Sequence, residues 1–469
     1  MKRWFNKGMV RDVRFWIVVF GIIRLYGITN APLEIAHSWR QVTVNMVARN
    51  FVENDANVFY PQVDMAGEKT GITGMEFPLL NYLIYLISKL FGFQHWYGRL
   101  INLIISSIGI FYFYKLIERY FTKQLAFNAS IFLLSSIWFA YSRKIMPDTF
   151  SVSLVMAGLY YASQYLSKGN IFRLLLSFSL LCLGVLSKLP AGYMLAFVPL
   201  MMFPFAQQPL KRFLALCLVL LSIGILNALW YFYWVPHLVE TYGYWHFYMG
   251  TSLRQGFSEI IHNLLPTSEK FYSDAMKFSG FILFIAGIVL SILHKNKKML
   301  WIFVLGSLAY SLVVIKGGRT FYLHSYYIIP FVPLMALVAA WSLQFIKSVR
   351  IIQLLMFLVI AEGILNQMHD FRINTREQHV LRLENIADLE IPKHDLMVIN
   401  GDVNPRDLYF THRKGWTIAN DQLRPNTLDS LRKLGCRFLI FDKTNDLPHY
   451  RFLYPIRYQD SDYVIFSLE

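Results

Sequence analysis

Long apolar runs separated by short polar connections dominate this chain. A helix that crosses a bilayer needs roughly 20 apolar residues. Runs close to that length lie at about 15–31, 98–116, 124–142, 149–167, 171–188, 190–206, 213–235, 277–293, 299–315, 325–345 and 350–367. The pattern therefore predicts a polytopic α-helical membrane protein with about eleven spans.

Basic clusters fall at alternate connections between these runs. They are Lys2 with Arg3, Lys7, Arg11 and Arg14, then Lys115 with Arg119 and Lys123, Lys168 with Arg173, Lys211 with Arg212, Lys295 with Lys297 and Lys298, and Lys347 with Arg350. Positive residues favour the cytoplasmic side, which predicts a cytoplasmic N-terminus. If the short apolar segment 78–93 crossed the membrane, every later basic cluster would lie on the outer side. We therefore expect this segment to lie in the interface or to re-enter.

Composition agrees with this topology. Of 469 residues, 55% are hydrophobic and only 16% are charged, which is too apolar for an ordinary soluble protein. The net charge of +16 comes from short clusters typical of cytoplasmic loops and of contact with anionic lipids, so no nucleic-acid partner is predicted. Cys182, Cys217 and Cys436 show no metal-ligand spacing and no disulfide framework.

The chain divides by composition into two parts. Residues 1–370 are predicted to form the membrane domain, with a first outer loop at 31–97, and residues 371–469 a small α/β domain on the outer side. The segments 396–400, 438–441 and 463–466 are predicted strands. A helix between them is expected to begin at the N-cap Asn426, to turn Leu428, Leu431 and Leu434 to one face, and to stop at Gly435.

The first outer loop is unusually rich in ionisable residues for a segment held against a membrane. It contains Glu34, His37, Arg40, Arg49, Asp64 and Glu76. Such groups are costly near hydrocarbon and mark chemistry or a substrate path. Residues 37–51 can form a helix in the membrane interface, with Trp39 on its apolar side. It is either a plain surface helix or the element that places His37 and Arg40 beside a lipid-borne substrate.

Further polar residues lie on the same predicted outer face. Asp148 can be a plain first-turn acid of a helix, and Lys188 either snorkels to the surface or holds a phosphate. The other candidates are Lys144, Arg319, His324 and Tyr326, together with Trp245, His246 and Tyr248 of the loop 236–276, which either stack on a sugar or lie in the interface.

Together these groups suit one reaction class. Carboxylates or a histidine can act as a general base, and cations can stabilise a leaving phosphate. This combination favours transfer of a sugar from a polyprenyl-phosphate to a hydroxyl or amine. No nucleotide-phosphate motif is present.

Several segments resemble a known family in their order and spacing. They are VARNF (47–51), GMEFPLLNYLIYLISKLFG (74–92), YGRL (97–100), SRKIMPDTF (142–150), LSKLPAG (186–192) and YYIIPFVPLMALVAA (326–340). The chain resembles the membrane-embedded GT-C glycosyltransferases, specifically the bacterial relatives of protein O-mannosyltransferase and of the lipid A aminoarabinose transferase. The resemblance implies site roles for Asp148 and Glu76, phosphate binding by Lys188 and Arg319, and a donor contact for Tyr326.

One departure from that family concerns the base. Its members usually carry an acidic pair where this chain has Arg40 and Gln41. The base is then one of Glu34, His37, Asp64 and Glu76. Phe77 stands where the family often has a phosphate-binding lysine, so that role passes to Arg40, Lys188 or Arg319.

The resulting expectation is an inverting glycosyltransferase of the bacterial inner membrane, with its site and C-terminal domain in the periplasm. Its donor would be a polyprenyl-phosphate sugar, and its acceptor lipid A, a surface glycan, a glycolipid or a protein. A divalent metal ion is one possible cofactor, because acidic residues are present, although their spacing is not diagnostic of a metal site. The alternatives are a polysaccharide polymerase or ligase and, from another class, a transporter or flippase, for which neither paired halves nor matching broken spans are seen.

Overall fold

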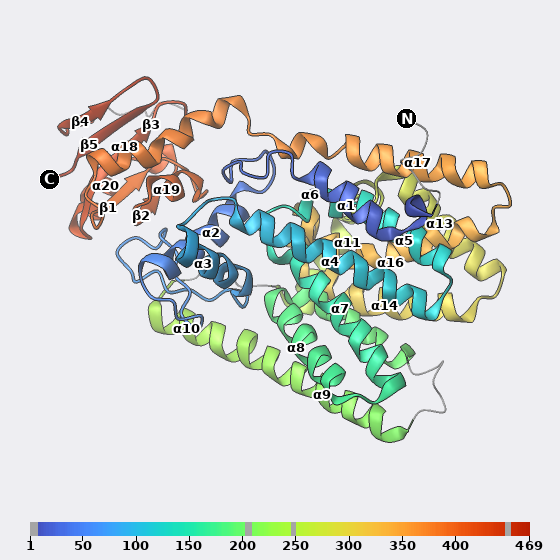
Figure 1. The fold of residues 1–469 in the computed structure, drawn as a ribbon. Coiled ribbons are helices and arrows are strands. Elements are labelled where there is room, and N and C mark those ends of the chain that lie inside the picture. The colour runs from blue at the N-terminus through green and yellow to red at the C-terminus, as the bar shows by residue number, and fades with distance from the viewer. Residues whose placement is uncertain (1–7, 202–208, 245–249, 446–451) are drawn as a thin grey trace. The chain divides into compact units, whose positions relative to one another are not determined.

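The computed structural model describes residues 8–201, 209–244, 250–445 and 452–469. The chain forms two compact units (Figure 1). Unit 1 comprises Met1–Ile28, Arg99–Tyr233 and Met249–His369, and unit 2 comprises Thr29–Gly98, Trp234–Tyr248 and Asp370–Glu469. Lys2, Arg3, Lys7, Trp245, His246 and Tyr248 lie outside the described residues.

Unit 1 is helical, and within the described residues each predicted apolar run contains helix. The elements are α1 (Val13–Arg24), α4 (Tyr97–Tyr120), α5 (Lys123–Ser135), α6 (Trp138–Tyr141), α7 (Pro147–Lys168), α8 (Ile171–Ser187), η2 (Leu189–Phe197), α9 (Leu210–Ala228), η4 (Leu229–Trp234), α11 (Leu253–His262), α12 (Leu264–Glu269), η5 (Lys270–Ala275), α13 (Lys277–Leu293), α14 (Lys297–Gly317), α15 (Arg319–Leu323), η6 (Ser325–Phe331), α16 (Val332–Ser342) and α17 (Val349–Leu365).

By length and composition, four helices of the described chain are able to cross a membrane. They are Tyr97–Tyr120, Leu210–Tyr242, Lys297–Gly317 and Ser325–Phe345, and a fifth is added if Leu264–Ala275 and Lys277–Leu293, bent by 101°, form one span. The other apolar runs form helices that are shorter, broken or less apolar. The chain is thus a multi-pass membrane protein, and the count of about eleven spans stays a prediction.

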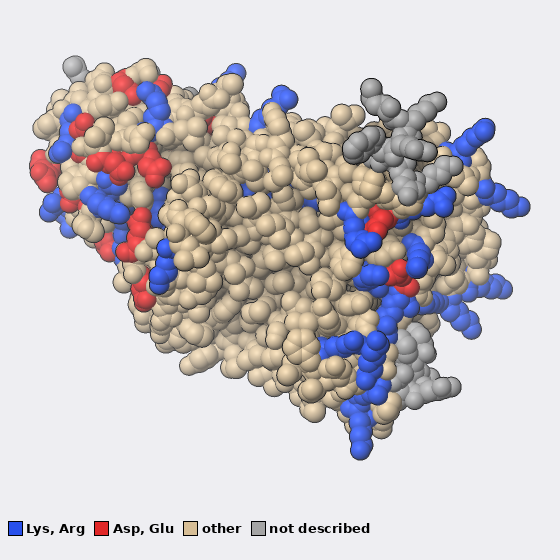
Figure 2. Space-filling model, in the orientation of Figure 1, with Lys and Arg blue, Asp and Glu red and all other residues tan. Residues whose placement is uncertain are grey.

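The basic clusters of unit 1 meet at one end of its helices. Arg119, near the end of α4, donates to the carbonyl of Ser163 near the end of α7 (3.2 Å). Lys298, at the start of α14, donates to the carbonyl of Tyr120. On the face shown in Figure 2, Lys and Arg side chains gather over this end. Clusters that are far apart in sequence therefore share one side, as the alternation along the chain predicts.

Unit 2 contains a five-stranded sheet in the order β2-β1-β3-β5-β4. The strands are β1 (Leu396–Ile399), β2 (Gly415–Thr417), β3 (Cys436–Asp442), β4 (Ile456–Gln459) and β5 (Tyr463–Ser467). β1 runs parallel to β2 and β3, whereas β5 is antiparallel to β3 and β4. The three predicted strands are confirmed. The two edge strands were not predicted, because they are short and lack a buried apolar run.

The helix α20 (Pro425–Lys433) differs from its prediction. Arg424 occupies its N-cap position without a side-chain capping hydrogen bond, and the helix begins at Pro425, so Asn426 lies inside the first turn. Proline at the first helical position fixes φ for the helix, which explains the earlier start. Leu428 and Leu431 are buried, but Leu434 is 47% exposed because the helix has already ended.

The first outer loop and the C-terminal tail share one hydrophobic core in unit 2. Val42, Met46 and other loop residues pack with Met397 and Ile440 of the sheet. The helix α2 (Ser38–Glu53) is buried on all sides from Arg40 to Phe51. The prediction of a surface helix with only one buried face is therefore wrong, because its polar side is covered as well: Arg40 donates to Glu76, and Asn45 donates to the carbonyl of His95.

The segment 78–93 forms α3 (Leu79–Phe91), a helix of 13 residues. At 1.5 Å per residue it is about 20 Å long, short of a bilayer core of about 30 Å. Leu80 and Ile84 are buried, whereas Leu86, Leu90 and Phe91 are exposed. An exposed apolar face on a short helix fits the expected position in the membrane interface, which stays a prediction.

Candidate active site

The site in unit 1 depends on close packing between α7 and α8. A side chain at Gly184 would lie 2.8 Å from Val155, and one at Gly158 2.7 Å from Leu181. Ser151 of α7 donates to the carbonyl of Gly184 (2.7 Å). Glycine thus lets the two helices approach closely, and this brings the end of α8 beside the start of α7.

Asp148 and Lys188 meet at this point. Asp148 lies in the first turn of α7, as predicted, and Lys188 follows the last residue of α8. Lys188 Nζ is 3.9 Å from Asp148 Oδ1, and both residues are at most 3% exposed. Lys188 therefore does not snorkel to the surface. Its ammonium stays buried because a carboxylate partly offsets the cost of removing it from water.

Aromatic rings complete the surroundings of Lys188. Its Nζ lies 5.6 Å from the ring centroid of Tyr326 and 5.8 Å from that of Tyr327, within range of a cation–π attraction. The His324 ring stacks on Tyr326 at 5.2 Å. The structure thus gathers four of the predicted residues, Asp148, Lys188, His324 and Tyr326, within one unit.

Lys144 lies in the loop between α6 and α7, shortly before Asp148 in the sequence. Lys144 is fully buried, with Nζ 5.5 Å from the Tyr141 ring centroid. The Asn102 amide holds this loop by donating to the carbonyls of Tyr141 (3.1 Å), Lys144 (2.8 Å) and Met146 (3.2 Å). Asn102 was missed from sequence, where its only signal was a polar residue inside an apolar run.

Arg319 is placed differently from the other predicted cations. It begins α15, its side chain is exposed, and its backbone N–H donates to Glu259 (2.6 Å). Its predicted phosphate contact remains a prediction.

In unit 2, Arg40 of α2 donates a hydrogen bond to Glu76, and both residues are buried. Glu34 is also buried, and its backbone forms a β-bridge with Ile373 of the tail. His37 is half-buried just before α2 in the left-handed region (φ 63°). A residue other than glycine rarely adopts this conformation, so the surrounding fold holds His37 in place.

Asp64 has a different set of partners. Arg49 Nη2 lies 2.9 Å from one carboxylate oxygen, and Asn50 donates to the other (2.8 Å). Arg49 also donates to the carbonyl of Tyr409 in α19 (Arg406–Thr411) (3.1 Å). Asp64 therefore helps to join the outer loop to the tail.

A chain of imidazoles and carboxylates, missed from the sequence, joins the same parts. His412 Nε2 lies 2.6 Å from Glu53, and His412 Nδ1 lies 3.4 Å from Glu384 of α18 (Leu383–Glu390). Glu384 also lies 3.4 Å from His95 Nε2. Burial of the imidazole lowers the pKa of His412, but hydrogen bonds to Glu384 and Glu53 outweigh it, so the pKa is raised. Hydrogen bonds from His412 and His95 lower the pKa of Glu384. These residues are far apart in sequence, so no local pattern could reveal them.

Within the described residues, no group of three or more His, Cys, Asp or Glu side chains is arranged to hold a metal ion.

Comparisons with known proteins bear on this geometry. The model of the dolichyl-phosphate-mannose-protein mannosyltransferase family matches residues 76–234, less than half of the chain. The structure of ArnT from Cupriavidus metallidurans in the apo state matches with a TM-score of 0.61 and 12% identity, covering 96% of this chain and 97% of that one. The same protein bound to undecaprenyl phosphate matches with a TM-score of 0.58, 12% identity, and coverage of 96% and 98%. This chain has the GT-C fold.

A second GT-C structure, the Archaeoglobus fulgidus oligosaccharyltransferase in the apo form, matches with a TM-score of 0.54 and 12% identity, covering 94% of this chain and 70% of that one. No curated protein sequence matches the chain. Within the GT-C fold, the range matched by the family model contains Glu76, Lys144, Asp148 and Lys188. The resemblance to the GT-C glycosyltransferases that the sequence motifs indicated is confirmed.

Proposed function

We propose that this protein is an inverting GT-C glycosyltransferase that moves a sugar from a polyprenyl-phosphate donor to an acceptor at the outer face of a bacterial inner membrane. The observation that carries the proposal is the buried Asp148–Lys188 pair beside Tyr326 and Tyr327. A buried cation with a fixed partner is suited to receive a negative charge that develops during the reaction.

In the proposed reaction, an acceptor oxygen or nitrogen attacks the anomeric carbon of the donor sugar. The bond between that carbon and the phosphate oxygen breaks, and the electron pair leaves with the phosphate. A single displacement of this kind inverts the anomeric centre. Lys188 stabilises the leaving phosphate as a point charge, and Asp148 orients the ammonium.

A base must accept the proton of the attacking group. Glu76 and Asp148 are candidates because each is a buried carboxylate beside a cation, Arg40 and Lys188 respectively. Glu34 and His37 remain candidates. Asp64 is disfavoured because both of its oxygens are already engaged.

The relatives support the class of donor. ArnT of Cupriavidus metallidurans has been crystallised with undecaprenyl phosphate, and the matched family acts with dolichyl-phosphate-mannose. Both lipids are polyprenyl phosphates, the first without a sugar and the second carrying mannose. We therefore assign such a lipid to this chain, with a lipid, glycan or protein as acceptor.

The proposed orientation places the N-terminus in the cytoplasm and the site outside. The ends of α4 and α7, which carry Arg119 and Lys168, lie together with the basic start of α14. Asp148 occupies the opposite end of the 22-residue helix α7, about 30 Å away at 1.5 Å per residue. With the basic end inside, the Asp148–Lys188 pair faces outward.

The proposal is tested with purified protein in nanodiscs and a radiolabelled polyprenyl-phosphate sugar from the native membrane. Asp148→Asn, Glu76→Gln and Lys188→Ala should each abolish transfer while the protein still inserts into the membrane. Lys168→Ala, at the other end of α7, is the matched control and should keep full activity. Wild-type activity in all three site variants would overturn the proposal.

A further inference from the structure

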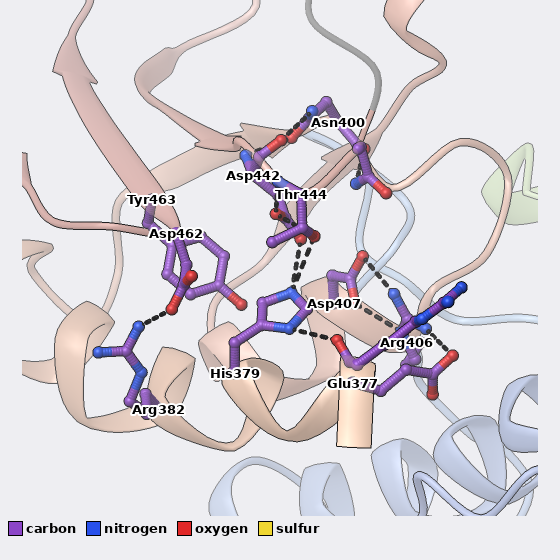
Figure 3. A network of polar contacts seen from close by, with 12 residues as sticks. Glu377, His379, Arg382, Asn400, Arg406, Asp407, Asp442, Thr444, Asp462 and Tyr463 are labelled. Carbon is purple, nitrogen blue, oxygen red and sulfur yellow. Dashed lines mark hydrogen bonds and ion pairs between the residues drawn. The ribbon is translucent and has the colours of Figure 1, made fainter. Parts of the chain in front are cut away.

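The hydroxyl of Tyr463, the first residue of β5, is buried without a hydrogen-bond partner among the described residues. The residue is 0% exposed. A buried polar group without a partner costs free energy, and native structures contain few of them. Figure 3 shows this hydroxyl directed toward His379 and Asp407. The unsatisfied group therefore marks a place where an outside atom would be stabilised.

The neighbouring side chains are polar and held in fixed positions. His379 Nε2 lies 3.1 Å from Asp442, and Thr444 donates to the other oxygen of that carboxylate (2.7 Å). Arg406 pairs with Asp407 (2.6 Å) and with Glu377 (3.0 Å) (Figure 3). We call these residues, with Tyr463, the tail cluster.

Two members of the tail cluster have altered proton affinities. Burial and then the nearby carboxylates of Asp442 and Asp407 raise the pKa of Tyr463, so its hydroxyl keeps its proton. Burial also raises the pKa of Asp407, although Arg406 opposes this shift. Tyr463 is therefore a hydrogen-bond donor at neutral pH.

The tail cluster lies at the carboxyl ends of the parallel strands. Asn400 directly follows β1 and Asp442 ends β3, and the Asn400 amide donates to the Asp442 carbonyl (3.0 Å). The chain leaves β1 for β2 on one side and then returns to β3 on the other side. In open α/β sheets, ligands bind outside the carboxyl ends of strands at such a reversal of strand order.

We propose that the tail cluster binds a neutral sugar residue. A sugar hydroxyl both donates and accepts, which matches a mixture of the Tyr463 hydroxyl, carboxylates and an arginine. Several carboxylates facing the same space disfavour a phosphate. Thr444 is exposed, and Arg406 and Glu377 are 16% and 32% exposed, so members of the tail cluster reach the protein surface. This proposal goes beyond glycosyl transfer and does not depend on it.

The test uses the full chain in nanodiscs and saturation-transfer NMR with methyl glycosides of glucose, galactose, mannose, N-acetylglucosamine and arabinose. At least one glycoside should give a signal with the wild-type protein. Tyr463→Phe should lower that signal at least fivefold while leaving the melting temperature unchanged or higher, because it removes an unsatisfied buried hydroxyl. Tyr458→Phe, in the neighbouring strand β4, is the matched control and should keep the signal.

A signal from none of the glycosides would overturn the proposal. So would a wild-type signal from Tyr463→Phe, because the glycoside would then bind without contacting the hydroxyl. Loss of polyprenyl-phosphate-dependent transfer in Lys188→Ala with an unchanged glycoside signal would show that the two proposals are independent.

Discussion

Lys188 Nζ and Asp148 Oδ1 lie 3.9 Å apart, and both residues are buried where α8 ends beside the start of α7. Breaking a buried ion pair by removing one partner leaves an uncompensated charge, which typically costs about 3–5 kcal/mol. The single mutants are therefore expected to be unstable whether the pair is structural or catalytic. The two roles predict different transfer activities for the double mutant.

The first prediction concerns this double mutant. Asp148→Asn and Lys188→Met should each lower the melting temperature, and the double variant should recover most of that loss because no unpaired charge remains. Transfer should stay at least about 100-fold below wild type in the double variant, as expected when an electrostatic stabiliser is removed. Thermal unfolding and transfer rates are measured on the same preparations. Recovery of activity together with stability would assign the pair a purely structural role.

The second prediction concerns the packing that positions Lys188. Gly184→Ala should lower transfer because the new methyl group would meet Val155 at 2.8 Å and push α8 away from α7. Gly224→Ala, in α9, is the control, because no atom lies within 4 Å of the added carbon there. The control should be neutral or slightly stabilising, since alanine favours helix. Equal activity in the two variants would contradict this account.

The third prediction separates Asp64 from the site. Because its carboxylate pairs with Arg49 and Asn50, Asp64→Asn should destabilise the protein by about 1–3 kcal/mol, as expected for a disrupted hydrogen-bonded charge. The transfer rate per folded molecule should change less than about threefold, which is under 1 kcal/mol in barrier height. A 100-fold loss without a change in melting temperature would restore Asp64 as a candidate base.

The fourth prediction is a pH optimum for the junction between the outer loop and the tail. The pKa of His412 is raised above 6.5, so its stabilisation is complete below that pH and is lost as pH rises through the folded pKa. The pKa of Glu384 is lowered below 4.5, so its stabilisation is present above that pH and is lost on further acidification. Protection of α18 and α19 should therefore peak between these values.

Hydrogen exchange of the segments 383–390 and 406–411 across pH 4 to 9 measures this protection directly. Glu384→Gln should flatten the decline on the alkaline side, because the Nδ1–H of His412 then loses its carboxylate acceptor. An unchanged pH profile in this variant would show that the imidazole–carboxylate chain does not stabilise the junction.

The fifth prediction concerns topology. In a variant without Cys182, Cys217 and Cys436, a cysteine at Lys123 should react only with reagents that reach the cytoplasm, and one at Asp402 only from outside. A spin label at Leu90, on the exposed apolar face of α3, should be accessible to oxygen in the membrane interface. Labelling of positions 123 and 402 from the same side of the membrane would contradict the predicted topology.

Much of the fold follows from the sequence, because local patterns determine it. The apolar runs predicted the helices of unit 1, and apolar segments predicted β1, β3 and β5, since burial of these residues is favourable in any arrangement. The edge strands β2 and β4 were missed because pairing with a neighbour, and not their own composition, makes them strands. The start of α20 was misplaced because proline at its first position competed with the predicted asparagine cap.

The candidate residues could also be selected from sequence, because charges beside hydrocarbon are conspicuous. Their partners could not. Lys188 approaches Asp148 because two glycines allow α7 and α8 to pack closely, and α2 is buried because both α3 and the tail, more than 300 residues later, pack against it. The sequence by itself thus determined which segments are apolar and which groups carry charge. Only the tertiary structure decided which charges meet, because burial and pairing depend on contacts between residues distant along the chain.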